Sequence, residues 1–398
     1  MSLKSRLAAV SERLRASLTP LLMESLGGRD LRPSVITETL GLDKSLASRI
    51  SRALRASDPM EFLHEIPTPQ GLTILLDACA GASASEDGLN EGRASVEALR
   101  SLLVEFPGGR NDLDAALAAW IPSLRTTALR KGRREIFRGW STVMGIRSAC
   151  RYVGYFVMPS ETPGRLDTFW VSSRQGLRRL REDEPVEIAG IVTNDPATFA
   201  QRRSLDGRSF LEEPHSMLCE AFTSMESGAF TVVEETDRRV LSIAGNAPEV
   251  NHPVHVTIGG CTQSHFDDHV SEDESYLWVD TVAMEPTETL IVDFLVHEDV
   301  KSAGPPLITR IIEGSRSYGS SAVPSDLGPA ALEHGLELVS METTSSLADA
   351  VEVAHWRDLL DYACGVRGHS LEAFQLHRFR EEFPLPMHRT AIWLPLPE

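Results

Sequence analysis

The sequence predicts a multidomain chain, with an all-α N-terminal domain followed by an α+β domain that has a mainly antiparallel sheet and C-terminal helices. Three observations support this prediction. The chain has 398 residues, which is more than one ordinary core accommodates. Leucines near the N-terminus recur at helical spacing. From about Arg151 the sequence changes to short β-branched and aromatic runs separated by Gly, Pro, Asn and Asp, which are typical of strands and turns.

The first expected helix carries an apolar stripe and ends at Gly27-Gly28. Its spacing also resembles a short heptad seam, so the helix either packs within its own domain or pairs with a second chain as a homodimer. The stripe consists of Leu3, Leu7, Val10, Leu14, Leu18 and Leu21.

Two shorter helices follow, from Pro33 to Gly41 and from Lys44 to Ala56, with Asp43 as the N-cap of the second. The Gly- and Ser-rich stretch 81–92 is typical of a linker. The predicted organisation is a helical domain over 1–80, the linker over 81–92, a basic helical connector over 93–150 and the α+β domain over 151–398.

Within the α+β domain, the stretch YLWVDTVAMEPTETLIVDFLV predicts a hairpin that turns at Glu285–Glu288. The C-terminal part predicts three helices, over Pro329–Leu336, Ser346–Cys364 and Leu371–Glu382. We assign this domain no role beyond ligand binding or dimerisation.

Charge is distributed unevenly along the chain. The formal net charge is −18, yet residues 1–60 carry a net +4 and residues 125–151 a net +7. Residues 240–300 contain twelve acidic residues and neither Lys nor Arg. Because phosphate is repelled by an acidic surface, any contact with a polyanion is expected in the first ~150 residues.

The segment 35–55 has the apolar pattern of two helices joined by a tight turn. Val35, Ile36 and Leu40 are the inward residues of the first helix, and Gly41 is the turn glycine. The second helix directs Leu46, Ala47 and Ile50 inward. Its outward residues are of the types that reach base edges and phosphates from a helix in the major groove, and they are Lys44, Ser45, Ser48, Arg49 and Arg52.

The stretch TLGLDKSLASRISRAL resembles the helix-turn-helix of bacterial transcriptional regulators, with Gly41 at the turn and Ser51-Arg52 in the second helix. It departs from that pattern at Thr37, where such motifs usually carry Ala. The resemblance implies a DNA-binding transcriptional regulator whose partner is double-stranded DNA, contacted through Lys44, Ser45, Ser48, Arg49 and Arg52. A small-molecule effector is a further partner that it allows. The alternative is a plain helical hairpin with a solvated basic face.

A second basic stretch, Leu124–Trp140, combines six Lys or Arg side chains with Phe137 and Trp140. Such a mixture suits single-stranded nucleic acid or an anionic ligand. It equally suits a helix that docks on the acidic β-rich domain, which would make the chain a protein-interaction module.

The remaining candidate site is a His/Asp cluster in which His265 and His269 are four residues apart and Asp267 and Asp268 lie between them. Imidazole and carboxylate suit a divalent cation, but a solvated acidic loop explains the same residues. No short signature of a P-loop, a Rossmann site or an α/β-hydrolase is present. We therefore predict no catalytic residue, metal or cofactor, and keep an enzyme or small-molecule-binding protein with its site in the β-rich domain as the alternative function.

Five scattered cysteines predict neither a disulfide framework nor a zinc site. The N-terminal stretch lacks the apolar region of a signal peptide, and no run approaches the ~18 apolar residues of a membrane span. The sequence therefore predicts a cytoplasmic protein.

Overall fold

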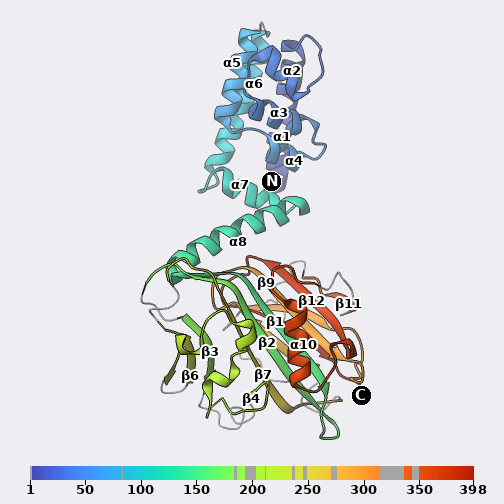
Figure 1. Cartoon of the computed structure of the whole chain (residues 1–398). Coiled ribbons are helices and arrows are strands. Elements are labelled where there is room, and N and C mark those ends of the chain that lie inside the picture. The colour runs from blue at the N-terminus through green and yellow to red at the C-terminus, as the bar shows by residue number, and fades with distance from the viewer. Residues whose placement is uncertain are drawn as a thin grey trace. The chain divides into compact units, whose positions relative to one another are not determined.

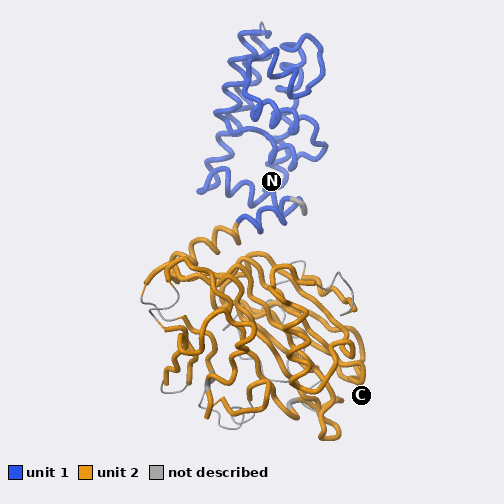
Figure 2. The backbone as a smooth tube through the Cα atoms, in the orientation of Figure 1, with its two compact units in different colours: residues 1–131 blue, residues 132–398 orange. Residues whose placement is uncertain are grey.

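In the computed structural model, the chain divides into two compact units, unit 1 (residues 1–131) and unit 2 (residues 132–398), coloured separately in Figure 2. This boundary near residue 131 differs from the boundaries near residues 80 and 150 that the sequence predicted. The structure describes residues 2–82, 84–182, 186–192, 203–210, 212–234, 238–244, 249–269, 276–312, 336–342 and 349–398.

Unit 1 is entirely helical in its described residues and has one hydrophobic core (Figure 1). Helix α1 (Leu3–Ser25) buries Leu7, Leu14 and Leu18 completely or almost completely, so its apolar stripe is used within the unit. The other helices are α2 (Pro33–Leu40), α3 (Lys44–Arg55), α4 (Pro59–Glu65), α5 (Pro69–Gly81), α6 (Glu86–Val104), α7 (Arg110–Ala118) and α8 (Pro122–Met144), the last of which continues into unit 2.

Most of the predicted linker 81–92 belongs to helix α6. Glu86 and Asp87 lie in the first turn of α6, where acidic side chains interact favourably with the helix dipole. Gly92 is buried against α5, and a Cβ atom there would lie 2.7 Å from Leu76 Cδ2. The glycines that indicated flexibility therefore include one that permits close helix packing.

Helices α2 and α3 and the turn between them agree with the sequence prediction. Gly41 ends α2 with φ = +66°, and its amide donates to the Thr37 carbonyl at 2.9 Å. Asp43 is the N-cap of α3, and its carboxylate accepts hydrogen bonds from the amides of Ser45 (2.7 Å) and Leu46 (3.4 Å). Ile36 is buried in the shared core.

Unit 2 contains a seven-stranded mixed sheet and two small antiparallel sheets in its described residues. Within the large sheet, β1 and β9 are parallel and the other neighbouring pairs are antiparallel. The order is β11 (Val339–Glu342), β12 (Phe374–Glu382), β9 (Thr287–His297), β1 (Ile146–Pro159), β2 (Arg165–Arg179), β7 (Val254–Asp267) and β4 (Arg203–Ser204). The small sheets are β10 (Leu307–Ile312), β13 (His388–Pro395) and β8 (Tyr276–Val282), and β3 (Val186–Val192), β6 (Arg238–Ile243) and β5 (Phe230–Glu234).

Different elements cover the two faces of the large sheet. Helix α10 (Trp356–Val366) packs through Trp356 and Leu360 against Tyr152 and Phe156 of β1 (Figure 1). The sheet β10-β13-β8 packs against the alternate residues of β1 and β9, in a core that includes Val157. The third sheet forms its own core with residues of β2 and β7.

The predicted hairpin turning at Glu285–Glu288 is wrong, because β8 and β9 belong to different sheets. The intervening segment is attached to the large sheet instead. Glu285 is buried and accepts hydrogen bonds from Arg151 Nη1 at 2.9 and 3.1 Å, and the Ser148 amide donates to the Pro286 carbonyl at 2.8 Å. These contacts hold the segment that connects β8 in the small sheet to β9 in the large sheet.

The C-terminal helices are confirmed only in part. Leu371–Glu382 is not a helix: after a short 3₁₀ turn at Leu371–Ala373 it forms strand β12, which pairs with β9 and β11. The strand is buried on both faces, and the charged side chain of Arg378 is buried with a partner on β9. In the described part of Ser346–Cys364 the helix starts at Trp356. Of the predicted helix Pro329–Leu336, all residues before Leu336 lie outside the described ranges.

Candidate nucleic-acid interface

One side of helix α3 is exposed and polar. Lys44, Ser45 and Arg52 are exposed and Ser48 is half-buried, whereas Ala47, Ile50 and Ala53 face the core. Arg55 is also exposed and continues the same stripe one turn beyond Arg52. The sequence prediction did not include Arg55. Its helical spacing from Ser48 and Arg52 places it on the same side of α3 and could have identified it.

The N-terminal end of α3 combines a fixed cap with free side chains. Hydrogen bonds from the side chain and the backbone amide of Ser45 hold the pKa of Asp43 below its ordinary value, together with the amide of Leu46. This cap orients the first turn, in which Lys44 is exposed. The cap thus gives the candidate contact residues a defined backbone geometry.

Arg49 differs from the other candidates because it is engaged inside unit 1. Its Nε donates to the Glu65 carbonyl at 3.0 Å and its Nη2 donates to the His64 carbonyl at 3.3 Å. These carbonyls belong to the last turn of α4, whose oxygens have no partner within the helix. The structure therefore gives Arg49 a contact that joins α3 to α4.

Arg110 of α7 binds further carbonyl groups at the C-terminal end of α4. It donates to the carbonyls of Ile66 (3.1 Å) and Leu63 (2.7 Å), also to that of His64, and to the Asp114 carboxylate (3.1 Å). Burial lowers the pKa of Arg110, and the charge of Asp114 counteracts that effect. Sequence reasoning missed this residue because the carbonyls that it binds lie more than 40 positions away.

Arg52 forms an ion pair with Glu65 of α4, with Nε 2.9 Å from the carboxylate oxygen. The side chains are 62% and 29% exposed, so water competes with the pair and it contributes little stability. A phosphate group could replace Glu65 as the partner of Arg52 at small cost. The arginine is thus available to a ligand in a way that Arg49 is not.

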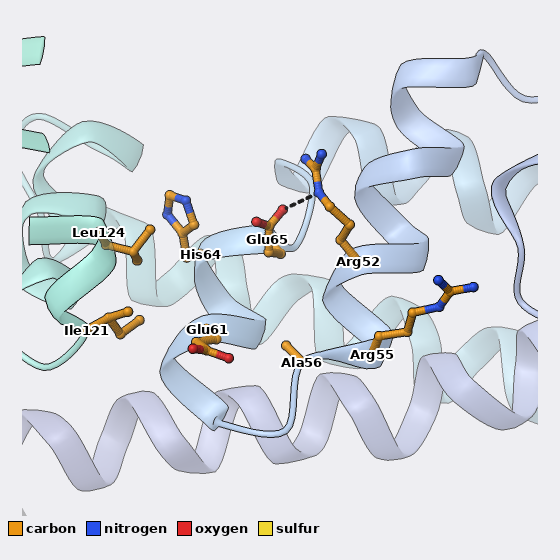
Figure 3. A pocket seen from close by; sticks show the side chains of 8 residues that line it. All are labelled: Arg52, Arg55, Ala56, Glu61, His64, Glu65, Ile121 and Leu124. Atoms are coloured by element: carbon orange, nitrogen blue, oxygen red, sulfur yellow. Dashed lines mark hydrogen bonds and ion pairs between the residues drawn. The ribbon is translucent and has the colours of Figure 1, made fainter. Parts of the chain in front are cut away.

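A surface pocket of about 320 Å³ lies beside the C-terminal half of α3 (Figure 3). We call it the α3–α4 pocket. Its charged side chains come from α3 and α4, and its larger apolar side chains come from the start of α8 and the residue before it. Its lining consists of Arg52, Arg55, Ala56, Glu61, His64, Glu65, Ile121 and Leu124.

The described residues of the predicted His/Asp cluster do not assemble into a metal site. In the residues that the structure describes, no group of three or more His, Cys, Asp or Glu side chains is placed to hold a metal ion. Asp267 pairs with Arg165 at 2.6 Å, and Asp268 with His269 at 2.8 Å. The side chain of His265 lies outside the described set.

The basic stretch Leu124–Trp140 lies in α8. Within unit 2, Arg133 of α8 donates to Glu381 at 2.6 Å, and the Phe137 ring lies 5.5 Å from that of Phe383. This part of the stretch therefore docks on its own unit, although its acidic partner lies on β12 and not within 240–300. Several of the described acids of 240–300 pair with other arginines, among them Asp280 with Arg389 and Asp293 with Arg378.

All five cysteines are buried and free in the structure. Across the described ranges, none of the helices has the length and apolar character needed to cross a membrane.

Comparisons with known proteins identify no family for this chain. No family model and no curated protein matches its sequence. Among solved structures it is similar to one described as the crystal structure of a "putative protease" from Parabacteroides distasonis, with 8% sequence identity and a TM-score of 0.31. The match covers 63% of this chain and 40% of that one, so the chain spans less than half the length of that protein. At this TM-score the similarity supports neither a shared fold nor a shared activity.

Proposed function

We propose that the protein is a DNA-binding transcriptional regulator that contacts double-stranded DNA through helix α3. The observation that carries the proposal is the polar stripe of α3, with Lys44, Ser45 and Arg52 exposed and Ser48 half-buried, on a helix whose opposite side is buried. The preceding α2 and the Gly41 turn provide the arrangement in which a second helix enters the major groove.

The candidate residues receive different roles in this proposal. Lys44, Ser45 and Ser48 lie at the N-terminal end of α3, the end that reaches base edges in helix-turn-helix proteins. Arg52 exchanges Glu65 for a phosphate. Arg49 is a positioning residue, because its guanidinium already binds the α4 carbonyls.

Charge supports unit 1 as the DNA-binding part of the chain. Residues 1–131 contain 16 Lys or Arg and 16 Asp or Glu, whereas residues 132–398 contain 23 and 41. The excess of 18 negative charges therefore belongs to unit 2. Phosphate is repelled less by unit 1, and least near its basic first 60 residues.

The test is the affinity of the full chain for random-sequence duplex DNA, measured by fluorescence anisotropy at ~50 and ~200 mM salt. Neutralisation of two phosphates by the exposed cations Lys44 and Arg52 predicts that log K falls with a slope of about −1.8 against log salt, which is a loss of about 12-fold over this range. Binding that is independent of salt, or absent at low salt, would remove the proposal and leave the helical hairpin as the interpretation.

A further inference from the structure

We infer that the α3–α4 pocket binds a small zwitterion with an aliphatic body, for which an aliphatic α-amino acid is the simplest example, and that this ligand regulates DNA binding. The regulatory part rests on the proposed function. The binding part rests on the pocket alone and has its own test.

The charged side chains of the pocket indicate a ligand that carries both a positive and a negative charge. Arg52 and Glu65 pair with each other, and His64 Nδ1 lies 3.1 Å from an Asp114 carboxylate oxygen outside the pocket. The two remaining charged side chains that line the pocket, Arg55 and Glu61, have no ionic or hydrogen-bonding partner among the residues that the structure describes. A carboxylate would complement Arg55, and an ammonium group would complement Glu61.

The apolar part and the size of the pocket restrict the rest of the ligand. Ile121 is 5% exposed and Leu124 is half-buried, and both lie on the same side of the pocket in Figure 3. They offer a hydrophobic contact to a short aliphatic chain. A volume of about 320 Å³ is at the lower end of the range for ligand pockets, so a small metabolite fits and a dinucleotide does not.

The position of the pocket explains how its occupant would act on DNA binding. The lining includes Arg52, which we assign to phosphate, and Arg55, which is three residues further along α3. The same lining includes Glu61 and Glu65 of α4. A ligand held by Arg55 and Glu61 bridges α3 and α4 and changes the field around the Arg52–Glu65 pair. The two binding events are then coupled, and the coupling must be the same in both directions.

The experiment on the binding part uses the full chain and isothermal titration with L-leucine. Two matched compounds separate the groups: 4-methylpentanoate lacks the ammonium group, and 3-methylbutylamine lacks the carboxylate. We expect leucine to bind, and each matched compound to bind about tenfold more weakly or worse. We expect the same loss of leucine affinity from Arg55→Gln and Glu61→Gln. The controls are Arg93→Gln and Glu91→Gln on exposed positions of α6, which should leave leucine binding unchanged.

The experiment on regulation repeats the DNA titration with saturating leucine. A change in DNA affinity, matched by an equal fold-change in leucine affinity when DNA is present, supports the inference. If DNA binds and leucine does not, the inference is overturned and the proposed function stands. If leucine binds and DNA does not, the pocket assignment stands and the proposed function is overturned. If both bind without affecting each other, the regulatory part is overturned.

Discussion

The two units of the chain place their charged side chains in opposite ways. Among its described residues, unit 1 buries no charged side chain, and its buried polar residues are all serines, namely Ser11, Ser17, Ser25, Ser51 and Ser95. Unit 2 buries eight charged residues in its described part, which are Asp167, Arg174, Arg179, Glu285, Asp293, Arg310, Arg378 and Glu381.

The centre of unit 2 shows what its buried charge does. Asp293 of β9 is fully buried and receives two hydrogen bonds from Arg378 of β12, at 2.6 and 2.7 Å. It also receives one from the Tyr152 hydroxyl and one from Trp356 Nε1 of α10, each at 2.9 Å. Burial, followed by the charge of Asp293, raises the pKa of Tyr152 well above its ordinary value. This network joins three strands and the covering helix.

The two units therefore differ in whether their charged side chains can bind a partner. In unit 2, Arg174, Arg310 and Arg378 each pair with a buried carboxylate, so these charges are directed into the fold. In unit 1 the core is apolar and the charges lie on the surface or at its edge. The exposed stripe of α3 is therefore free to bind, and this is the basis of the proposed function.

The largest loss of stability is expected from a substitution that breaks the buried network of unit 2. Asp293→Ala leaves Arg378 buried without its carboxylate, so we expect a loss of about 3–5 kcal/mol of stability. Chemical unfolding followed by tryptophan fluorescence measures it, since Trp356 is part of the network. The control, Asp299→Ala at an exposed carboxylate, should change stability by less than about 0.5 kcal/mol. Equal effects of the two substitutions would contradict the distinction between the units.

A smaller effect is expected at Arg110 of unit 1, whose side chain is 15% exposed. Arg110→Ala removes the donors of three α4 carbonyls, and we expect unit 1 to lose about 2 kcal/mol. Thermal unfolding followed by circular dichroism at 222 nm reports on the helices. Arg100→Ala, on an exposed side chain of α6, is the matched control and should be nearly neutral. A neutral result for Arg110→Ala would mean that the α4 carbonyls are satisfied by water.

The smallest effect on stability concerns the cap of α3. Asp43→Ala should destabilise unit 1 less than Arg110→Ala does, because it removes one exposed N-cap. The folded-state pKa of Asp43 is lowered, so its contribution is fully present above the unfolded value of 3.8 and is lost as pH falls through the folded value. The difference in melting temperature between wild type and Asp43→Ala should therefore shrink below about pH 4. A difference that persists at lower pH would count against the carboxylate cap.

The sequence predicted accurately the helix bounds and caps that depend on neighbouring residues. It did not predict contacts between residues that are far apart in the chain. Asp43, Gly41 and the leucine spacing place α2 and α3 nearly at their observed bounds, because caps and helical periods involve neighbouring residues. The partners of Arg49 lie 15 and 16 residues away, and those of Arg378 lie 85 residues away. Composition alone cannot locate such partners. For this reason the sequence predicted a helix where β12 lies and did not reveal the contacts that Arg49 makes within unit 1.

The same distinction applies to the candidate site. Lys44, Ser45, Ser48 and Arg52 follow from helical spacing, and the structure finds three of them exposed and Ser48 half-buried. The α3–α4 pocket depends on Ile121 and Leu124, which are more than 60 positions from Arg52 and carry no sequence signal that links them to it.

The most direct test of the central claim compares two double variants of equal charge in the DNA-binding assay at low salt. Lys44→Gln/Arg52→Gln removes two cations from the exposed stripe of α3, and Arg93→Gln/Arg100→Gln removes two from exposed positions of α6. Arg52 and Arg100 each have one surface ion pair, so both variants lose a similar, small amount of stability. We predict that the α3 variant loses about tenfold or more in DNA affinity and that the α6 variant loses little. Equal losses would show that any DNA binding follows net charge alone and would contradict the assignment of α3 as the contact helix.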